Sequence, residues 1–236
     1  MKRTSFSGWL SQALWLISRT PLIWIGYMLF IALLLGVGRI SLALGVFLSV
    51  TSLFVGVGMA KYTDLKNSAG HSVGFYWAVN KSLPLAVLAA VSILICWFVF
   101  RLVANVYTGE WEKIVQFFFY WELTPENMAD KSLRQLAGWL YSSAIVTLIF
   151  VLLMLTTFAS WFSYPLMLFK DYTWSQAKVQ GNKAVTRHQN AMYKLLGFVF
   201  VVVFIGGGMM PLLTPFLYVL VSTLMYVSYR TIFEPE

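Results

Sequence analysis

The sequence has few charged residues. Lysine, arginine, aspartate and glutamate make up 11% of the 236 residues, whereas a soluble domain is about one quarter charged. Hydrophobic residues make up 59%, and the mean hydropathy is +0.74. So few polar residues cannot cover the surface of a soluble protein. The composition therefore predicts a membrane protein, and the length accommodates a single integral membrane domain over residues 1–236.

The residue types that carry most chemistry are also scarce. Cys96 is the only cysteine and lies in an apolar run, so neither a disulfide framework nor a zinc site is available. His71 and His188 are the only histidines, and no predicted span contains an acidic residue. The glycine run at 206–208 ends in methionines and a proline, which is not a phosphate-binding pattern. We therefore expect a non-enzymatic protein without catalytic, cofactor-binding or metal-binding residues.

Long apolar runs are plentiful, and they divide the chain. A helix needs about 20 apolar residues to cross a bilayer core. Six runs approach or exceed that length, at about 22–37, 40–60, 83–104, 136–164, 191–210 and 212–229. The longest connection, 105–135, is the central outer loop. The pattern predicts an all-α polytopic membrane protein with six transmembrane helices.

Basic residues are distributed unevenly between the two sides that six crossings define. With the N-terminus inside, twelve of the seventeen lie inside: Lys2, Arg3, Arg19, Lys61, Lys66, Lys81, Lys170, Lys178, Lys183, Arg187, Lys194 and Arg230. The remaining five are Arg39, Arg101, Lys113, Lys131 and Arg134. The positive-inside rule makes the richer side, with both termini, cytoplasmic. The net charge of +8 then faces the anionic inner leaflet, and nucleic-acid binding is not expected.

The stretch 174–190 is too polar to cross a membrane, yet it has helical periodicity. One face carries Trp174, Ala177, Gly181, Ala184 and Val185, and most of the rest is polar or basic. This pattern is typical of an amphipathic helix in the membrane interface, which we term an elbow. We expect the following residues to contact the lipid surface: Trp174, Lys178, Lys183 and Arg187.

Two further stretches resemble such elbows. SGWLSQALWLISRTPLIW (7–24) precedes the first span, and HSVGFYWAVNKSLPLAVL (71–88) precedes the third. Each has an aromatic amphipathic segment followed by a basic residue, a hydroxyl residue and proline, which is tolerated in the first turn of a helix. The pattern leaves open whether the chain consists of three elbow–hairpin repeats.

The outer loop combines aromatic and acidic residues. Its candidate docking residues are Trp111, Phe118, Trp121 and Glu122. Such a cluster is an aromatic belt at the headgroups or a docking patch for another protein. Thr124-Pro125-Glu126 has the form of a helix cap and predicts a short surface helix through about Arg134.

Arg101 is the only candidate for an intramembrane charge deep in the predicted spans. We expect its side chain to extend to the membrane surface or to pair with an acid such as Glu110. The spans also contain glycines that we expect at close helix contacts: Gly26, Gly36, Gly45, Gly56 and Gly58.

The passage WFSYPLMLF (161–169), followed by an amphipathic stretch and Asn190, resembles a passage of YciC-type bacterial inner-membrane proteins, which belong with related six-span families of unknown function. Ala13-Leu14-Trp15 with Pro21-Leu22-Ile23-Trp24 is similar to the start of one proteobacterial branch. Lysine and glycine in the third elbow depart from the small apolar or serine residues commoner there. The resemblance implies a multi-pass bacterial inner-membrane protein with cytoplasmic termini and contributes no catalytic residue.

Three functions fit these observations. The first is a scaffold or accessory protein that acts through contacts with anionic lipids and another membrane or periplasmic protein. The second is a transporter that handles lipids or small apolar solutes. The third is an immunity or accessory protein that shields a membrane-acting partner through the outer loop.

Overall fold

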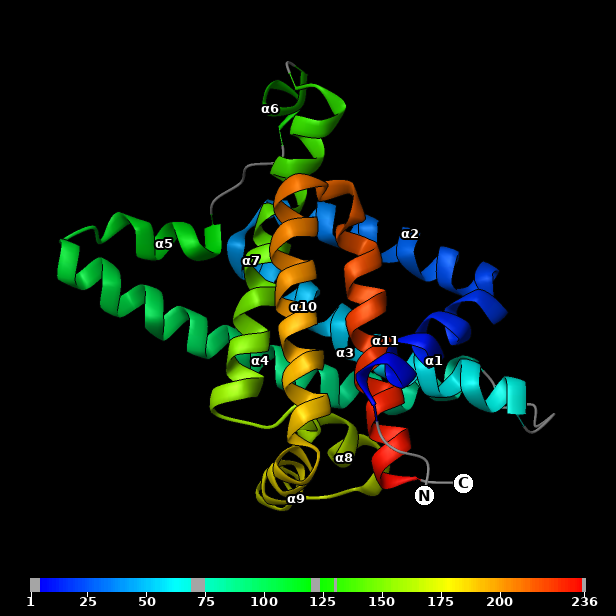
Figure 1. Ribbon diagram of the computed structural model, residues 1–236. Coiled ribbons are helices and arrows are strands. Elements are labelled where there is room, and N and C mark those ends of the chain that lie inside the picture. The colour runs from blue at the N-terminus through cyan, green and yellow to red at the C-terminus, as the bar shows by residue number, and fades with distance from the viewer. Residues whose placement is uncertain (1–4, 69–74, 120–123, 130, 235–236) are drawn as a thin grey trace.

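The protein is a bundle of helices. The computed structural model describes residues 5–68, 75–119, 124–129 and 131–234, and in these ranges helix is the only regular secondary structure (Figure 1). The helices are α1 (Phe6–Arg19), α2 (Pro21–Val37), η1 (Gly38–Ile40), α3 (Leu42–Ser68), α4 (Phe75–Thr108), α5 (Glu112–Phe119), α6 (Pro125–Ala129), α7 (Leu133–Thr157), α8 (Ser163–Lys170), α9 (Trp174–Arg187), α10 (Gln189–Met209), η2 (Pro211–Leu213) and α11 (Thr214–Phe233). Figure 1 shows α6 at one extreme of the molecule and α9 at the opposite one. Helix α5 lies in the same half of the molecule as α6, and we refer to that half as the α5 end and to the half with α9 as the α9 end.

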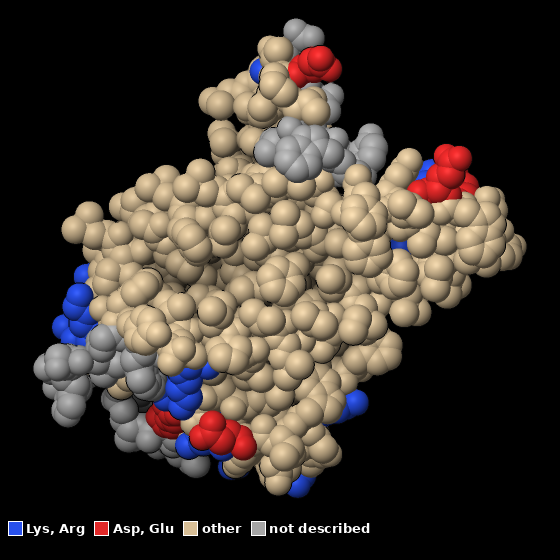
Figure 2. Space-filling model, turned by 180° about the vertical axis from the view of Figure 1, so that it is seen from behind, with Lys and Arg blue, Asp and Glu red and all other residues tan. Residues whose placement is uncertain are grey.

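Six of these helices, α2, α3, α4, α7, α10 and α11, are long and apolar enough to cross a membrane. The prediction of an all-α polytopic membrane protein is confirmed. The outer helices expose large apolar side chains, including Leu22 at 83%, Phe204 at 74% and Leu33 at 71%. Figure 2 shows a broad uncharged surface with charged side chains gathered at its margins. Such a large apolar surface is unfavourable in water and favourable in the hydrocarbon of a membrane.

The central helices are α3 and α11, which are largely buried, whereas a third or less of the residues are buried in the spans of α2, α4, α7 and α10. A Cβ added to Gly56 of α3 would lie 2.5 Å from the Ser222 hydroxyl of α11, so the helices approach closely there. Hydroxyl groups in the core are bonded internally: Tyr27 donates to the Ser52 carbonyl at 2.5 Å, and Tyr218 donates to the Ala144 carbonyl at 2.8 Å. Such bonds provide partners for polar groups that could not form hydrogen bonds with lipid hydrocarbon.

The predicted glycine contacts divide into two groups. Gly45, Gly56 and Gly58 each approach a neighbouring segment closely, as expected. The expectation for Gly26 and Gly36 is wrong, because an added Cβ there would meet nothing within 4 Å.

The second predicted elbow is not a helix of its own. Its described part, from Phe75, and the third span form one continuous helix, α4, with Pro84 inside it. Small residues recur every fourth position on the face of α4 that is buried, at Ala78, Ser82, Ala86 and Ala90. A Cβ on Gly58 of α3 would lie 2.7 Å from that of Ser82, so close helix packing continues across the expected boundary.

The fourth predicted span, 136–164, is also divided differently. α7 begins at Leu133, where Ser132 and Gln135 form a capping box, and ends at Thr157. A turn follows, and the Ser163 hydroxyl accepts a hydrogen bond from the Ser160 backbone N–H at 3.0 Å at the start of α8. The capping box also places Arg134 in α7, so the short helix predicted through about Arg134 is limited to α6.

Candidate functional site

The passage 158–170, which we call the junction segment, comprises the turn after α7 and helix α8. The Trp161 indole N–H donates to the Ser228 hydroxyl of α11 at 2.9 Å. The Tyr164 ring stacks on Phe54 of α3 with centroids 4.1 Å apart, and its hydroxyl donates to the Ser82 carbonyl of α4 at 3.2 Å. The junction segment therefore joins α3, α4 and α11 at the α9 end.

A second polar group at this end, the Asp64 cluster, consists of Lys61, Asp64, Tyr226, Tyr229, Arg230 and Glu234. The buried Asp64 carboxylate accepts a hydrogen bond from the Tyr226 hydroxyl and one from the Arg230 guanidinium at 2.7 Å. Lys61 pairs with Glu234 at 3.2 Å.

Aromatic contacts complete the Asp64 cluster. The Tyr229 hydroxyl donates to Glu234 at 2.9 Å. The Lys61 ammonium lies 4.4 Å from the Phe169 ring centroid, within cation–π range. These bonds connect α3 to the end of α11 and to α8. Every polar side chain named here has a partner within the cluster, which therefore holds α3, α8 and α11 together.

Helix α9 buries a narrow face of small residues against the bundle. Thr173 caps its start in a capping box with Gln176. Ala177, Gly181 and Ala184 are buried. A Cβ on Gly181 would lie 2.5 Å from the Ser160 hydroxyl oxygen, so only glycine permits this approach to the junction segment. The small residues predicted to face lipid therefore pack on protein, a correction to the elbow hypothesis.

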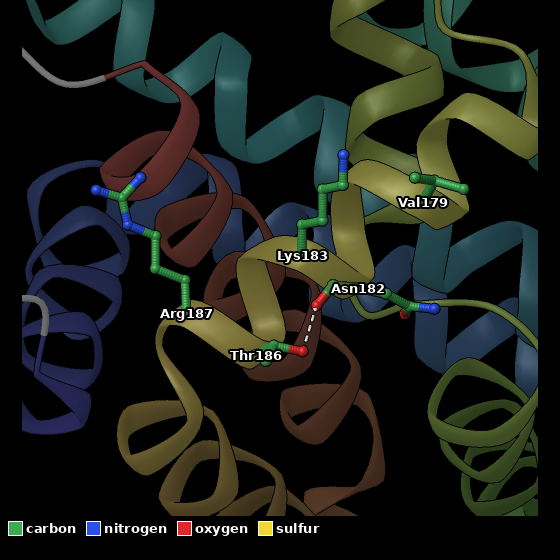
Figure 3. Close-up of a pocket in the computed structure, with 5 residues that line it drawn as sticks. All are labelled: Val179, Asn182, Lys183, Thr186 and Arg187. Atoms are coloured by element: carbon green, nitrogen blue, oxygen red, sulfur yellow. Dashed lines mark hydrogen bonds between the residues drawn. The ribbon is translucent and has the colours of Figure 1, made fainter.

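The other side of α9 is exposed. Trp174 and Val179 are 53% and 50% exposed, Lys183 and Arg187 are exposed, and Lys178 is half-buried. A shallow surface hollow of about 530 Å³ is lined by Val179, Asn182, Lys183, Thr186 and Arg187. Figure 3 shows these side chains spreading from the helix in different directions, with Thr186 hydrogen-bonded to the Asn182 carbonyl at 3.0 Å. They do not converge as catalytic groups would.

Helix α1 resembles α9 in its cap, in the positions of its buried residues and in its exposed face. Ser5 caps its first turn, and Trp9, Ala13 and Leu16 are buried at the same positions, counted from the cap, as the buried residues of α9. Its other side exposes Trp15, at 51%, with the Arg19 guanidinium 4.9 Å from the Trp15 ring centroid. Both α1 and α9 have a basic residue in the last turn.

The outer-loop candidates are only partly described. Trp111 and Phe118 are 61% and 41% exposed, and Phe118 packs edge-on against the buried Phe117. Trp121 and Glu122 lie outside the described residues. Glu110 pairs with Lys113, and the hydrogen bond from Lys113 is the main cause that lowers the pKa of the Glu110 carboxyl.

Arg101 is half-buried on α4, and in the described ranges no carboxylate forms an ion pair with it. The expected partner Glu110 instead pairs with Lys113. The alternative in which Glu110 pairs with Arg101 is therefore wrong in this structure.

The remaining candidates for chemistry are isolated. His188 lies between α9 and α10, where burial, followed by the charge of Arg187, lowers the pKa of its imidazole. Cys96 is exposed on α4. His71 lies outside the described residues. Among the residues that the structure describes, no three His, Cys, Asp or Glu side chains gather as a metal site would require.

Comparison of the chain with models of known families, with curated proteins and with solved structures finds no match. The resemblance of the junction segment to YciC-type proteins therefore stays a prediction. What the structure adds is that the quoted residues, Trp161, Phe162, Tyr164 and Phe169, are packing residues at the meeting point of several helices.

Proposed function

We propose that the protein is a non-enzymatic scaffold of the bacterial inner membrane, of the YciC type, with both termini in the cytoplasm. In this proposal the α9 end faces the anionic inner leaflet, and other membrane proteins assemble on the exposed helices. The observation that carries the proposal is that α1 and α9 each have a buried face and an exposed face of different composition. Each buries one face on the bundle and leaves tryptophan and basic side chains on the other.

The exposed residues suit a membrane interface. Trp15 and Trp174 are amphipathic rings of the kind enriched at headgroup depth. Arg19, Lys183 and Arg187 are exposed nearby on the same two helices. Each basic residue near an anionic leaflet contributes roughly 1 kcal/mol of attraction, which decays within a Debye length. The helices thus supply both apolar burial and electrostatic attraction.

A triple substitution on α9 tests this role. Replacing Lys178, Lys183 and Arg187 with glutamine should remove roughly 3 kcal/mol of attraction at most, since Lys178 is half-buried. The six spans would keep the protein in the membrane. An environment-sensitive probe at Gln180→Cys, in a Cys96→Ala background, should report more water around α9 in vesicles of phosphatidylglycerol and phosphatidylcholine.

The matched control is Arg134→Gln, which removes an exposed basic residue at the α5 end. It should leave the Gln180 signal unchanged. In vesicles of phosphatidylcholine alone, the wild type and the triple variant should give the same signal. If the variant shifts the signal equally in both lipids, the basic face of α9 binds protein, and its role in leaflet binding is refuted.

A further inference from the structure

Three side chains with N–H donors lie in a row on α4. Trp97, Arg101 and Asn105 are spaced four residues apart, which places them on one face of the helix. The indole Nε1 of Trp97, Nε of Arg101 and Nδ2 of Asn105 are each buried without a hydrogen-bond partner. The row lies in the half of α4 nearest the α5 end.

A buried donor without a partner lowers the stability of the folded protein by about 1–3 kcal/mol, and by more if the group is charged, because its lost hydration is not replaced. Asn105 is 5% exposed, so water does not readily compensate it. At one end of the row, the Trp97 ring packs edge-on against Phe150 of α7, with ring centroids 4.7 Å apart. Glu110 pairs with Lys113 and accepts from Thr108, and the charge of Arg101 is only the weakest of the causes that lower the pKa of its carboxyl. The row thus lacks the acceptor that its chemistry requires.

We propose that the Trp97–Arg101–Asn105 row binds a phosphate group. A phosphate offers several acceptor oxygens for these donors. It also supplies a negative counter-charge, which the Arg101 guanidinium does not have among the residues that the structure describes. Arg101 is half-buried, so an anion can reach it from the surface. α4 continues to Thr108, which puts Arg101 about 10 Å from that end of the helix, at a rise of about 1.5 Å per residue.

A membrane phospholipid is the source that this location favours. The opposite face of the same stretch exposes Val99 at 50%, Phe100 at 66% and Val103 at 64%. These exposed apolar side chains suit contact with acyl chains, and a lipid beside α4 brings its phosphate to the depth of the row. Free phosphate or a soluble phosphate ester would present the same oxygens.

The test is native mass spectrometry of the delipidated full-length protein in detergent, titrated with phosphatidylglycerol. The wild type should retain one lipid more tightly than the rest. Arg101→Gln should weaken that binding about tenfold or more, and Asn105→Leu about fivefold. Arg134→Gln, an exposed arginine at the same end, should bind like the wild type.

Two further ligands distinguish the source and the chemistry. Diacylglycerol, which has the tails without the phosphate, should not bind at this site. If glycerol 3-phosphate binds as tightly as phosphatidylglycerol, the phosphate assignment stands and its source is soluble. Diacylglycerol binding as tightly as phosphatidylglycerol would overturn the proposal.

Loss of folding is controlled with a second arginine variant. Arg101→Lys keeps the charge but not the planar set of donors, and it should fold while binding the lipid more weakly than the wild type. Equal lipid retention by Arg101→Lys, Asn105→Leu and the wild type would also overturn the proposal.

Discussion

At the scale of single residues, Asp64 shows how a membrane helix accommodates a charge. It lies in the apolar helix α3 but close to its end, where Tyr226 and Arg230 of α11 provide two hydrogen bonds. A carboxylate taken out of water is tolerated only when it is paired and hydrogen-bonded. The pair thereby fixes the register of α3 against α11.

Asp64→Asn should destabilise the protein. The side chain keeps its shape and can still accept from Tyr226, but Arg230 loses its counter-charge. Breaking a buried ion pair costs about 3–5 kcal/mol. Arg230 is 31% exposed, so solvent compensates in part and we expect about 2 kcal/mol. Equilibrium unfolding in detergent measures this loss.

The control for that substitution is Glu112→Gln, the same chemical change on an exposed residue of α5, which should be nearly neutral. A double-mutant cycle with Arg230→Gln isolates the pair. If Asp64→Asn and Arg230→Gln destabilise additively, the ion pair contributes nothing and the structural role assigned to it is wrong.

The sequence did not reveal this pair, for a physical reason. Asp64 and Arg230 are 166 positions apart, and Tyr226 is 162 positions from Asp64. Helical periodicity relates residues within a few turns only, so it identifies faces and not partners on other helices. Arg101 was recognisable as an unusual residue, because a charge in an apolar run is visible without knowledge of its neighbours.

At the scale of elements, α9 depends on one glycine. A Cβ at position 181 would lie 2.7 Å from the Cβ of Ser160, which cannot move away as a flexible side-chain end could. Alanine is intrinsically favoured over glycine in a helix by about 1 kcal/mol. The contact outweighs this preference if α9 is docked as the structure shows.

Gly181→Ala should therefore loosen α9 from the junction segment. Amides of α9 should exchange faster, and proteolysis near His188 should increase. Gly197→Ala is the matched control: its added Cβ meets nothing within 4 Å, so it should be neutral or stabilising. Adding Ser160→Gly to Gly181→Ala should restore part of the protection. Unchanged exchange in Gly181→Ala would contradict the docked position of α9.

Elements were predictable where their pattern is local. The amphipathic period predicted α9, and the aromatic amphipathic segment before the first span predicted α1, whereas the caps at Thr173 and Ser5 are findings of the structure. The second elbow merged into α4 because the packing of Ala78 and Ser82 on α3 continues into the span. This packing outweighs the local interruption by Pro84, so the helix continues through it. In the first unit the corresponding proline, Pro21, does begin a new helix.

At the scale of the whole molecule, hydropathy predicted six spans but not which lie at the centre. The innermost span, Pro211–Phe233, has the lowest hydropathy of the six, at 1.5, and the exposed Ala78–Thr108 has the highest, at 2.6. Hydroxyl residues such as Ser222, Thr223 and Ser228 lower the hydropathy of α11, and they are fully buried in the bundle. Each donates to a carbonyl of α11 itself, and burial keeps the hydroxyl out of lipid hydrocarbon. Low hydropathy among otherwise adequate spans was therefore a usable signal for the central helix.

The two ends of the molecule differ in ways that bear on function. The α9 end carries the outer face of α9 and the Asp64 cluster. The α5 end carries the aromatic residues of α5 and the Trp97–Arg101–Asn105 row. The proposal that the first end faces the cytoplasm fixes which leaflet each surface can meet.

The most direct test of the account is the sidedness of these two ends in intact bacterial cells. Single cysteines at Gln180 of α9 and Gln116 of α5, both exposed, are introduced in the Cys96→Ala background and treated with a membrane-impermeant thiol reagent. We expect Gln116→Cys to react in intact cells and Gln180→Cys to react only after the membrane is permeabilised. Reaction of Gln180→Cys in intact cells, with protection of Gln116→Cys, would contradict the proposed orientation and the role of α1 and α9 at the inner leaflet.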